Sequence, residues 1–244
     1  MPRKGHFYWM FFLPRRLLLP VLPVVALLLG GCQVTQGVGW SVVQHWQRTV
    51  SAEPQEARLD PRFEFLQMKL GDSPAAYLAL GKRVGASESW YSADPLLVVL
   101  EDGRLGPFAG AAVEWRAVRQ AGRPDWERLV RRGNTQRWQR QRDEMPGYRF
   151  GLSDEIETRR ITQTELPAEL TSVHERLLAS HRELRWVSDQ VSTTDPEGQR
   201  VAWAQWFAVA ERAGRWQVVW SRQCLRPDWC LELRPIGSSP AAQP

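Results

Sequence analysis

The sequence predicts a mainly β fold: a single domain of mostly antiparallel strands forming a curved sheet, a sandwich or an open barrel, with one or two minor helices. The first observation is a period-two alternation of apolar and polar residues in many short segments, which is typical of strands with one buried face. The second is that these segments recur about every ten residues between turn-forming residues, as in antiparallel meanders. The third is that helical periodicity is confined to two stretches.

The first four alternating segments predict a meander. They cover residues 63–70, 75–82, 88–92 and 96–100. Turn-forming residues separate or end them, at Gly71-Asp72, Gly81, Asp94-Pro95 and Asp102-Gly103. Gly and Asp tolerate the backbone angles of tight turns, and Pro fixes its own φ angle at a value that turns use. Each of these sites therefore predicts a reversal of the chain.

The clearest strand pair lies near the C-terminus, over residues 200–211 and 216–224, joined through residues 212–215. One face of the first strand carries Val201, Trp203, Gln205, Phe207 and Val209. Trp206 stands with small alanines on the opposite face. Side chains alternate across a strand, so both faces of this hairpin are expected to be partly covered.

Two stretches predict helices. Residues 124–132 begin with proline and an acidic residue, which the first turn of a helix favours. Within residues 166–184, apolar residues and one histidine recur at helical spacing. The positions are Leu166, Leu170, Val173, Leu177, His181 and Leu184.

The N-terminus carries the order of a bacterial lipoprotein signal. Arg15 and Arg16 precede an apolar run over residues 17–29, and Leu29-Gly30-Gly31-Cys32 closes it as a lipobox. The run is shorter than the roughly 20 residues that span a bilayer. We expect residues 1–31 to be removed and Cys32 to carry the lipid. A plain transmembrane anchor is the alternative, but lengthening the span would bury the two arginines at high cost.

The boundaries follow from composition. Residues 32–61 are polar and read as a lipidated tether that leads into the domain, with a short amphipathic stretch around Trp40, Val43 and Trp46. Residues 62–236 form the β-rich periplasmic domain. Residues 237–244 lack apolar residues to bury and should be a flexible tail.

The charge balance argues against nucleic acid. The 32 Lys and Arg residues exceed the 27 Asp and Glu residues. Four of these cations, Arg3, Lys4, Arg15 and Arg16, lie in the predicted leader, so the mature chain is close to neutral. We expect no nucleic-acid partner.

Cys224 and Cys230 remain as a pair after lipidation of Cys32. Thiols of exported chains are normally oxidised, so we expect a disulfide between them that closes a small turn. A redox-active pair is the alternative, and it would need closer spacing and an activating environment.

The sequence predicts no catalytic residues, no cofactor and no metal. Outside the leader the histidines are His45, His174 and His181, without the spacing of a metal site, and no phosphate-binding loop or nucleophile elbow occurs. The acid pairs Asp143-Glu144 and Asp154-Glu155 leave one alternative open. Two carboxyl groups several ångströms apart could serve glycosidic chemistry.

Tryptophan is in excess, with 13 residues. Large aromatic rings usually serve as core, which is our interpretation of Trp203, Trp216 and Trp220. Exposed rings can instead stack on sugars, and arginines can pair with acidic sugars or with the carboxylates of a partner. The candidate contacts for a glycan or a partner are Trp90, Tyr91, Arg104, Arg137, Trp206 and Trp229.

Several segments resemble the YjbF and GfcB family of exopolysaccharide and group 4 capsule operon lipoproteins. The lipobox is one, and the others follow in chain order. They are Thr35-Gln36-Gly37-Val38-Gly39-Trp40, Leu78-Ala79-Leu80, Glu88-Ser89-Trp90-Tyr91-Ser92-Ala93-Asp94, Leu100-Glu101-Asp102-Gly103-Arg104-Leu105, Trp138-Gln139-Arg140 and Asp189-Gln190-Val191-Ser192. The resemblance covers most of the mature chain, and the Gly-Arg-Leu element after Asp102 is its most specific part.

The resemblance implies a mostly β lipoprotein anchored in the outer membrane and facing the periplasm. It implies an accessory, non-catalytic role in producing or exporting exopolysaccharide or capsule, with polysaccharide and other export proteins as partners. Gln33, rather than aspartate, after the anchor favours sorting to the outer membrane. The alternatives are a polysaccharide-modifying enzyme and a carrier of lipid or lipoprotein with a half-barrel cavity.

Overall fold

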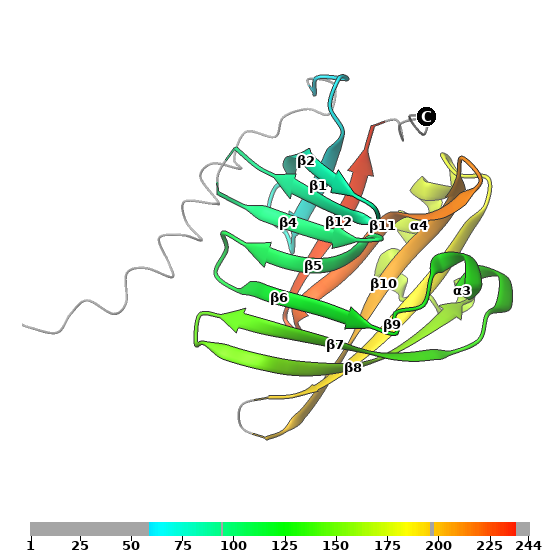
Figure 1. The fold of residues 1–244 in the computed structure, drawn as a ribbon. Coiled ribbons are helices and arrows are strands. Elements are labelled where there is room, and N and C mark those ends of the chain that lie inside the picture. The colour runs from blue at the N-terminus through cyan, green and yellow to red at the C-terminus, as the bar shows by residue number, and fades with distance from the viewer. Residues whose placement is uncertain (1–58, 94, 196–197, 238–244) are drawn as a thin grey trace, which may run out of the picture. The chain divides into compact units, whose positions relative to one another are not determined.

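The computed structural model describes residues 59–93, 95–195 and 198–237. The predicted leader, Cys32, residues 33–58 of the tether with its amphipathic stretch, and the tail beyond Gly237 lie outside these described residues. Twelve antiparallel strands of the described chain form a closed barrel in sequence order (Figure 1). The strands are β1 (Phe65–Leu70), β2 (Ala76–Val84), β3 (Ser87–Tyr91), β4 (Leu97–Glu101), β5 (Arg104–Ala109), β6 (Glu114–Ala121), β7 (Gln136–Met145), β8 (Arg149–Ile161), β9 (Leu184–Thr194), β10 (Arg200–Arg212), β11 (Arg215–Arg226) and β12 (Trp229–Ile236).

The predicted antiparallel β fold is confirmed, and closure of the barrel decides between the shapes that the sequence left open. β1 pairs with β12 over six residue pairs, from Phe65 opposite Ile236 to Leu70 opposite Leu231. This pairing joins the first and last strands, so the sheet has no free edge at which other chains could add a strand.

The predicted meander of residues 63–100 is confirmed except at Gly81. This residue lies inside β2, not in a turn, and the pairing of β2 with β3 shifts by one residue between Leu80 and Lys82. A Cβ atom at Gly81 would lie 2.6 Å from the ring of Tyr91. Glycine therefore lets the ring of Tyr91 lie against the bulged strand, and a larger residue would displace that ring.

The first predicted helix is confirmed, and the second is shorter than predicted. Helix α3 (Trp126–Arg132) begins after Asp125, whose side chain accepts a hydrogen bond from the amide of Arg128. The second stretch forms two 3₁₀ turns, η2 (Gln163–Glu165) and η3 (Ala168–Leu170), and then helix α4 (Thr171–Leu178). Leu184 already belongs to β9 but packs in the same cluster as Leu177, which explains why the apolar spacing continued beyond the helix.

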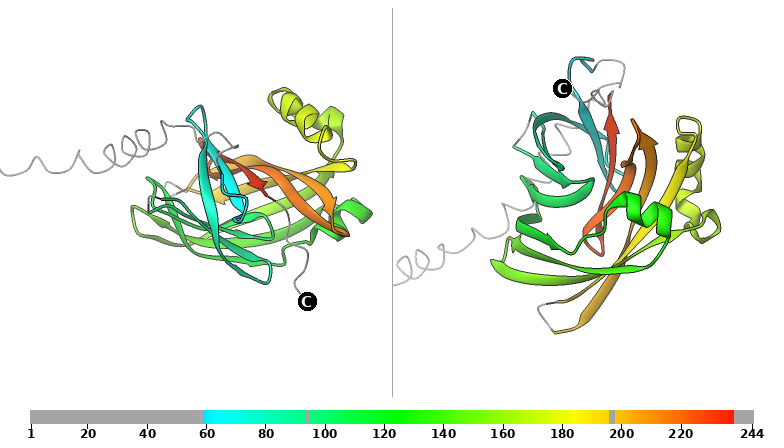
Figure 2. Two further views of the ribbon diagram at one scale, coloured as in Figure 1. Left: turned by 90° about the horizontal axis from the view of Figure 1, so that it is seen from above. Right: turned by 45° about the vertical axis from the view of Figure 1, so that its right-hand side comes forward.

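Strand β10 is covered on both faces, as predicted. Trp203, Gln205, Phe207 and Val209 are buried on one face. Ala208 and Ala210 are buried on the other, in the cluster that α4 forms with β9 and β11. Figure 2 shows α4 outside the barrel wall, so the alanines leave room for the helix.

The hairpins alternate between two ends of the barrel. At the proximal end β1 begins, β12 ends, and the β2–β3, β4–β5 and β10–β11 turns lie together with α3. The β1–β2, β3–β4, β5–β6, β7–β8, β9–β10 and β11–β12 connections lie at the distal end. Across the described ranges, no helix combines the length and the apolar character that crossing a membrane requires.

Candidate functional site

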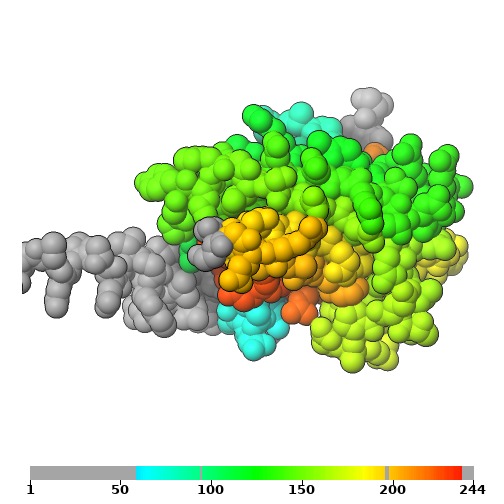
Figure 3. Space-filling view, turned by 90° about the horizontal axis from the view of Figure 1, so that it is seen from below, coloured from blue at the N-terminus to red at the C-terminus, as the bar shows by residue number. Residues whose placement is uncertain are grey.

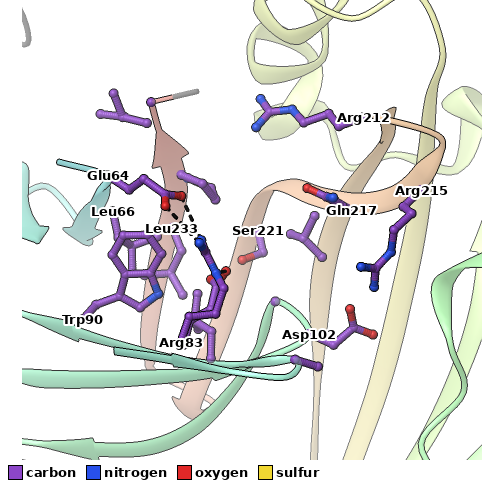
Figure 4. A pocket seen from close by; sticks show the side chains of 18 of the residues that line it. Glu64, Leu66, Arg83, Trp90, Asp102, Arg212, Arg215, Gln217, Ser221 and Leu233 are labelled. Atoms are coloured by element: carbon purple, nitrogen blue, oxygen red, sulfur yellow. Dashed lines mark hydrogen bonds and ion pairs between the residues drawn. The ribbon is translucent and has the colours of Figure 1, made fainter. Parts of the chain in front are cut away.

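A cavity of about 450 Å³ opens at the proximal end, and we call it the proximal cavity (Figure 4). Arg83, near the end of β2, lies between the carboxylates of Glu64 and Glu88, which also line this cavity. Its Nη2 is 2.8 Å from Glu64, and its Nε is 3.0 Å from Glu88. The hydrogen bond to Glu64 contributes most to raising the pKa of Arg83. Trp90 also lines this cavity, and its buried Nε1 has no hydrogen-bond partner in the described structure.

Asp102, in the β4–β5 turn, also lines the proximal cavity. Burial raises the pKa of its carboxyl group, against the opposing charges of Arg123, Arg104 and Arg215. Figure 4 shows Asp102 and Arg215 pointing toward each other, with Arg212 extending from the same β10–β11 hairpin. Burial lowers the pKa of Arg212.

A second cavity, of about 400 Å³, opens at the distal end, and we call it the distal cavity. At its centre is Glu144 of β7, which is 1% exposed. Its carboxylate accepts hydrogen bonds from Arg142 Nη1 at 2.7 Å and from Arg226 Nε at 2.9 Å, and Arg149 also pairs with it. Three guanidinium groups from β7, β8 and β11 thus converge on one carboxylate.

The charged network continues inside the barrel wall. Arg142 also holds Asp154 of β8 with both arms of its fork, at 3.1 and 3.2 Å, and Arg140 Nε reaches the same carboxylate at 2.8 Å. The guanidinium carbons of Arg140 and Arg142 lie 4.3 and 4.8 Å from the ring centroid of the buried Trp115. Burial lowers the pKa of Arg140, and the charge of Asp154 opposes that effect.

A second buried ion pair lies deeper in the interior. Arg104 Nε is 3.3 Å from Asp189 of β9, and its guanidinium carbon lies 3.7 Å from the ring centroid of Trp126. Thr158 donates a hydrogen bond to Asp189 and accepts one from Trp138 Nε1 at 2.8 Å. Burying ions is costly unless each is paired, so this interior depends on its network.

Two exposed aromatic residues neighbour Arg149 in the sequence. The β7–β8 turn exposes Tyr148 by 75% and Phe150 by 65%, on either side of Arg149, which lines the cavity. Tyr148 has a positive φ of 52°, a strained conformation for a bulky residue. Figure 3 views the molecule from below Figure 1 and shows β7 and β8 in green beside the yellow-orange β9–β10 hairpin.

Trp203 lines the same cavity from β10. It is 8% exposed, and its buried Nε1 has no hydrogen-bond partner among the described residues. Buried indole N–H groups normally find a partner, and those of Trp90 and Trp115 lack one as well in the described structure.

The residues proposed from the sequence as glycan or partner contacts do not form one site. Two of them are corrected by the structure: Trp90 and Arg104 point into the barrel and are 1% and 2% exposed, so neither is a surface platform. Tyr91 is exposed and lies against Gly81. Arg137 is exposed, pairs with Glu157, and lines a separate hollow on the outer wall.

The two remaining tryptophans pack against the core. Trp206 is partly buried against the cluster under α4. Trp229 meets Phe108 edge to face, with ring centroids 5.9 Å apart. The predicted core role of Trp203 and Trp220 is confirmed by their burial, and Trp216 is partly buried.

The predicted pairing of Cys224 with Cys230 is confirmed, since a disulfide joins them across the β11–β12 hairpin. Three residues of the loop that it closes, Leu225, Arg226 and Pro227, line the distal cavity. The crosslink therefore holds one wall of this cavity.

In each adjacent acid pair proposed from the sequence, one carboxylate lies inside the barrel and the other lies on its outer side. Asp154 is buried inside, whereas Glu155 is exposed and pairs with Arg200. Glu144 is likewise inside, and Asp143 accepts a hydrogen bond from Gly151. Consecutive residues of a strand face opposite sides, so neither pair can act on one bond.

Sequence reasoning missed Arg149, Arg226 and the exposed Tyr148 and Phe150 as members of a site, and it named Glu144 only as one of an acid pair. One available signal was the aromatic, arginine, aromatic order of residues 148–150 directly after Pro146-Gly147. No group of three or more metal-ligating side chains occurs among the described residues, and His174 accepts a hydrogen bond from Trp186 Nε1 at 3.0 Å.

Comparison with known proteins identifies the fold. No protein family and no curated protein matches the sequence. Among solved structures, the crystal structure of the hypothetical lipoprotein YmcC from Escherichia coli (K12) is similar, with a TM-score of 0.56 and 17% identity. The match covers 73% of this chain and 89% of that one, so the two proteins share a fold.

Proposed function

We propose that the chain is a lipoprotein of the YjbF and GfcB family, anchored in the outer membrane through Cys32 and facing the periplasm. Its role would be accessory and non-catalytic, in the production or export of exopolysaccharide or capsule. The observation that carries this proposal is the fold shared with a protein described as a hypothetical lipoprotein. The lipobox at Cys32 supports it independently.

The state of the buried carboxylates supports a non-catalytic role. Glu144, Asp154 and Asp189 are each paired with arginine. Glycosidic chemistry needs two carboxyl groups that reach the same bond of a sugar, whereas these carboxylates are held inside the barrel by arginines.

Deleting the gene and restoring it tests the accessory role. The deletion strain should carry less surface polysaccharide, and the wild-type gene should restore it. A Cys32→Ala version should not, because the unlipidated chain would lose its place at the membrane. Unchanged polysaccharide in the deletion strain, with its synthesis genes expressed, would contradict the proposal.

A polysaccharide-modifying enzyme is the second candidate, and one observation favours it. Asp102 has a raised pKa and lines a cavity that also holds Glu64 and Glu88. Incubating the purified chain with the strain's own polysaccharide and measuring new reducing ends tests this. Turnover that Asp102→Asn abolishes would replace the accessory role with an enzymatic one.

A further inference from the structure

We propose that Tyr91 and Phe63 form a stacking platform for the rings of a polysaccharide built from β-linked hexoses, on the outer wall of strands β1 to β3. The inference rests on the proposed function and deepens it, because it names the surface with which the lipoprotein would contact the polymer. We call this surface the aromatic shelf. It consists of Phe63, Phe65, Ala79, Gly81 and Tyr91.

The ring of Tyr91 lies across the neighbouring strand. Trp90 points into the barrel, so Tyr91, the next residue of β3, points outward. A Cβ atom at Gly81 of β2 would lie 2.6 Å from both Cδ2 and Cε2 of Tyr91, so the ring takes the space that a side chain would fill there. Tyr91 nevertheless remains 47% exposed. The ring is thus supported by β2 and open toward solvent.

Phe63 brings a second exposed ring to the same place. The amide of Leu80 donates a hydrogen bond to the carbonyl of Glu64 over 2.9 Å, and continuing this antiparallel register places Phe63 beside Gly81. Phe63 is 52% exposed, and its ring meets that of Phe65 edge to face, with the centroids 6.5 Å apart. Both exposed rings of the shelf therefore reach the surface beside one glycine.

Apolar side chains extend the shelf across four strands. Phe65, Ala79, Tyr91 and Leu97 stand opposite one another in a row from β1 to β4. Phe65, Ala79 and Leu97 are each half-buried, so the row is a continuous, partly exposed apolar surface. Adjacent strands lie about 4.8 Å apart, so the row spans about 14 Å. This length exceeds that of one sugar ring and suits a chain of several.

Polar groups border the shelf. Lys82 of β2 is exposed and stands opposite Ser89 of β3. On the other side of the row, the Tyr77 hydroxyl accepts a hydrogen bond from Gln67 Nε2 at 3.0 Å and keeps its own O–H as a donor. A β-linked hexose carries its hydroxyl groups around the ring edge and C–H groups on its faces. Its face would stack on the aromatic rings while its hydroxyl groups bond to these polar side chains.

The size of the shelf favours a glycan over a folded protein as its occupant. A large aromatic side chain has about 200 Å² of surface, so Phe63 and Tyr91, each about half exposed, offer about 200 Å² together. A stable protein interface buries about 800 Å² on each partner. Two open rings among polar groups therefore suit a ligand that is contacted one ring at a time.

Calorimetric titration of the full-length lipidated chain tests the shelf. The chain is kept in lauryldimethylamine oxide, because this detergent carries no sugar headgroup that could compete. The probes are cellotetraose, a chain of β-linked glucose rings, and sorbitol, which carries hydroxyl groups without a ring. Cellotetraose should bind and sorbitol should not. Equal binding of the two probes, or no binding of cellotetraose to the wild type, would overturn the proposal.

Matched variants locate the contact. Tyr91→Ala and Phe63→Ala should each weaken cellotetraose binding at least about fivefold, because each removes one stacked ring. Tyr91→Phe keeps the ring and should bind like the wild type, whereas Tyr91→Leu keeps only apolar character and should bind as weakly as Tyr91→Ala. Phe150→Ala is the control, because Phe150 is 65% exposed but lies at the start of β8. Wild-type affinity in Tyr91→Leu would show a general apolar contact and exclude stacking.

Gly81→Ala tests the position of the ring. The added methyl group would collide with the ring edge of Tyr91 and lift it from β2, so binding should weaken although both aromatic residues remain. In a Tyr91→Ala background the same change should have no further effect on binding. A further loss there would mean that Gly81 acts through the fold and not through the ring.

Circular dichroism spectra show which variants fold, and the exposure of Tyr91 and Phe63 means that their alanine variants should. Wild-type affinity in the folded Tyr91→Ala and Phe63→Ala variants would place the ligand elsewhere and sink the inference. That result would leave the polysaccharide phenotype of the deletion strain intact, so the two proposals can fail separately.

Discussion

Arg226 on β11 donates a hydrogen bond from Nε to Glu144 on β7, over 2.9 Å, although 82 residues separate them in the chain. The two strands are not neighbours in the sheet. The bond therefore spans the distal end of the barrel, where Arg149 from β8 joins it. Glu144 thus joins β7, β8 and β11 through ion pairs with Arg142, Arg149 and Arg226.

Glu144→Gln should destabilise the barrel by about 3 kcal/mol, because it removes a buried carboxylate that the buried Arg142 shares with the partly exposed Arg149 and Arg226. Urea unfolding measures the change. Glu155→Gln is the matched control on the outer wall, where the exposed pair with Arg200 should contribute well under about 1 kcal/mol. Equal effects of the two substitutions would show that the buried network is dispensable.

The packing of α4 is tested by two neighbouring leucines. Leu177 is buried against the barrel wall and Leu178 is largely exposed. Leu177→Ala should cost about 2 to 3 kcal/mol through lost burial and a residual cavity, and Leu178→Ala under about 0.5 kcal/mol. A larger loss at Leu178 than at Leu177 would mean that the helix presents a different face.

The disulfide should stabilise the distal hairpin. Replacing both Cys224 and Cys230 by serine should lower the unfolding free energy by about 2 kcal/mol, since the closed loop is short. Thermal unfolding with and without reductant measures it. Reductant should lower the melting temperature of the wild type and leave the serine variant unchanged; a wild type insensitive to reductant would contradict the assignment.

The raised pKa of Asp102 predicts a pH-dependent stability. Because burial raises the pKa in the folded state above that in the unfolded chain, the folded state holds this proton more tightly, and stability falls as pH rises between the two values. Asp102→Asn should therefore stabilise the protein at pH 7, and the gain should shrink as pH falls toward 4. Asparagine also tolerates the positive φ of 52° at this position. A gain that is constant with pH would exclude the titration of Asp102 as its cause.

The strands were predictable because their signal is local. Alternation over residues 63–70 follows directly from one buried face of the strand. Residues 200–211 instead place large side chains on one covered face and small alanines on the other. Closure was not predictable, because the pairing of Phe65 with Ile236 joins the two ends of the domain and leaves no pattern within either strand.

The candidate site was largely hidden from the sequence. Arg104, Arg140 and Arg142 are charged, and charged residues are rarely fully buried, so they indicated an outer face. Their burial depends on carboxylates from other strands, such as Asp154 and Asp189, whose positions emerge only from the register of the closed barrel. The disulfide was the exception, since its two cysteines lie six residues apart.

The lipid anchor is the foundation of the proposed function, and mass spectrometry of the mature chain tests it most directly. The chain purified from its native membranes should begin at Cys32, with a diacylglyceryl group on the sulfur and a mass that excludes residues 1–31. An intact N-terminus that carries no fatty acyl chain would contradict the account.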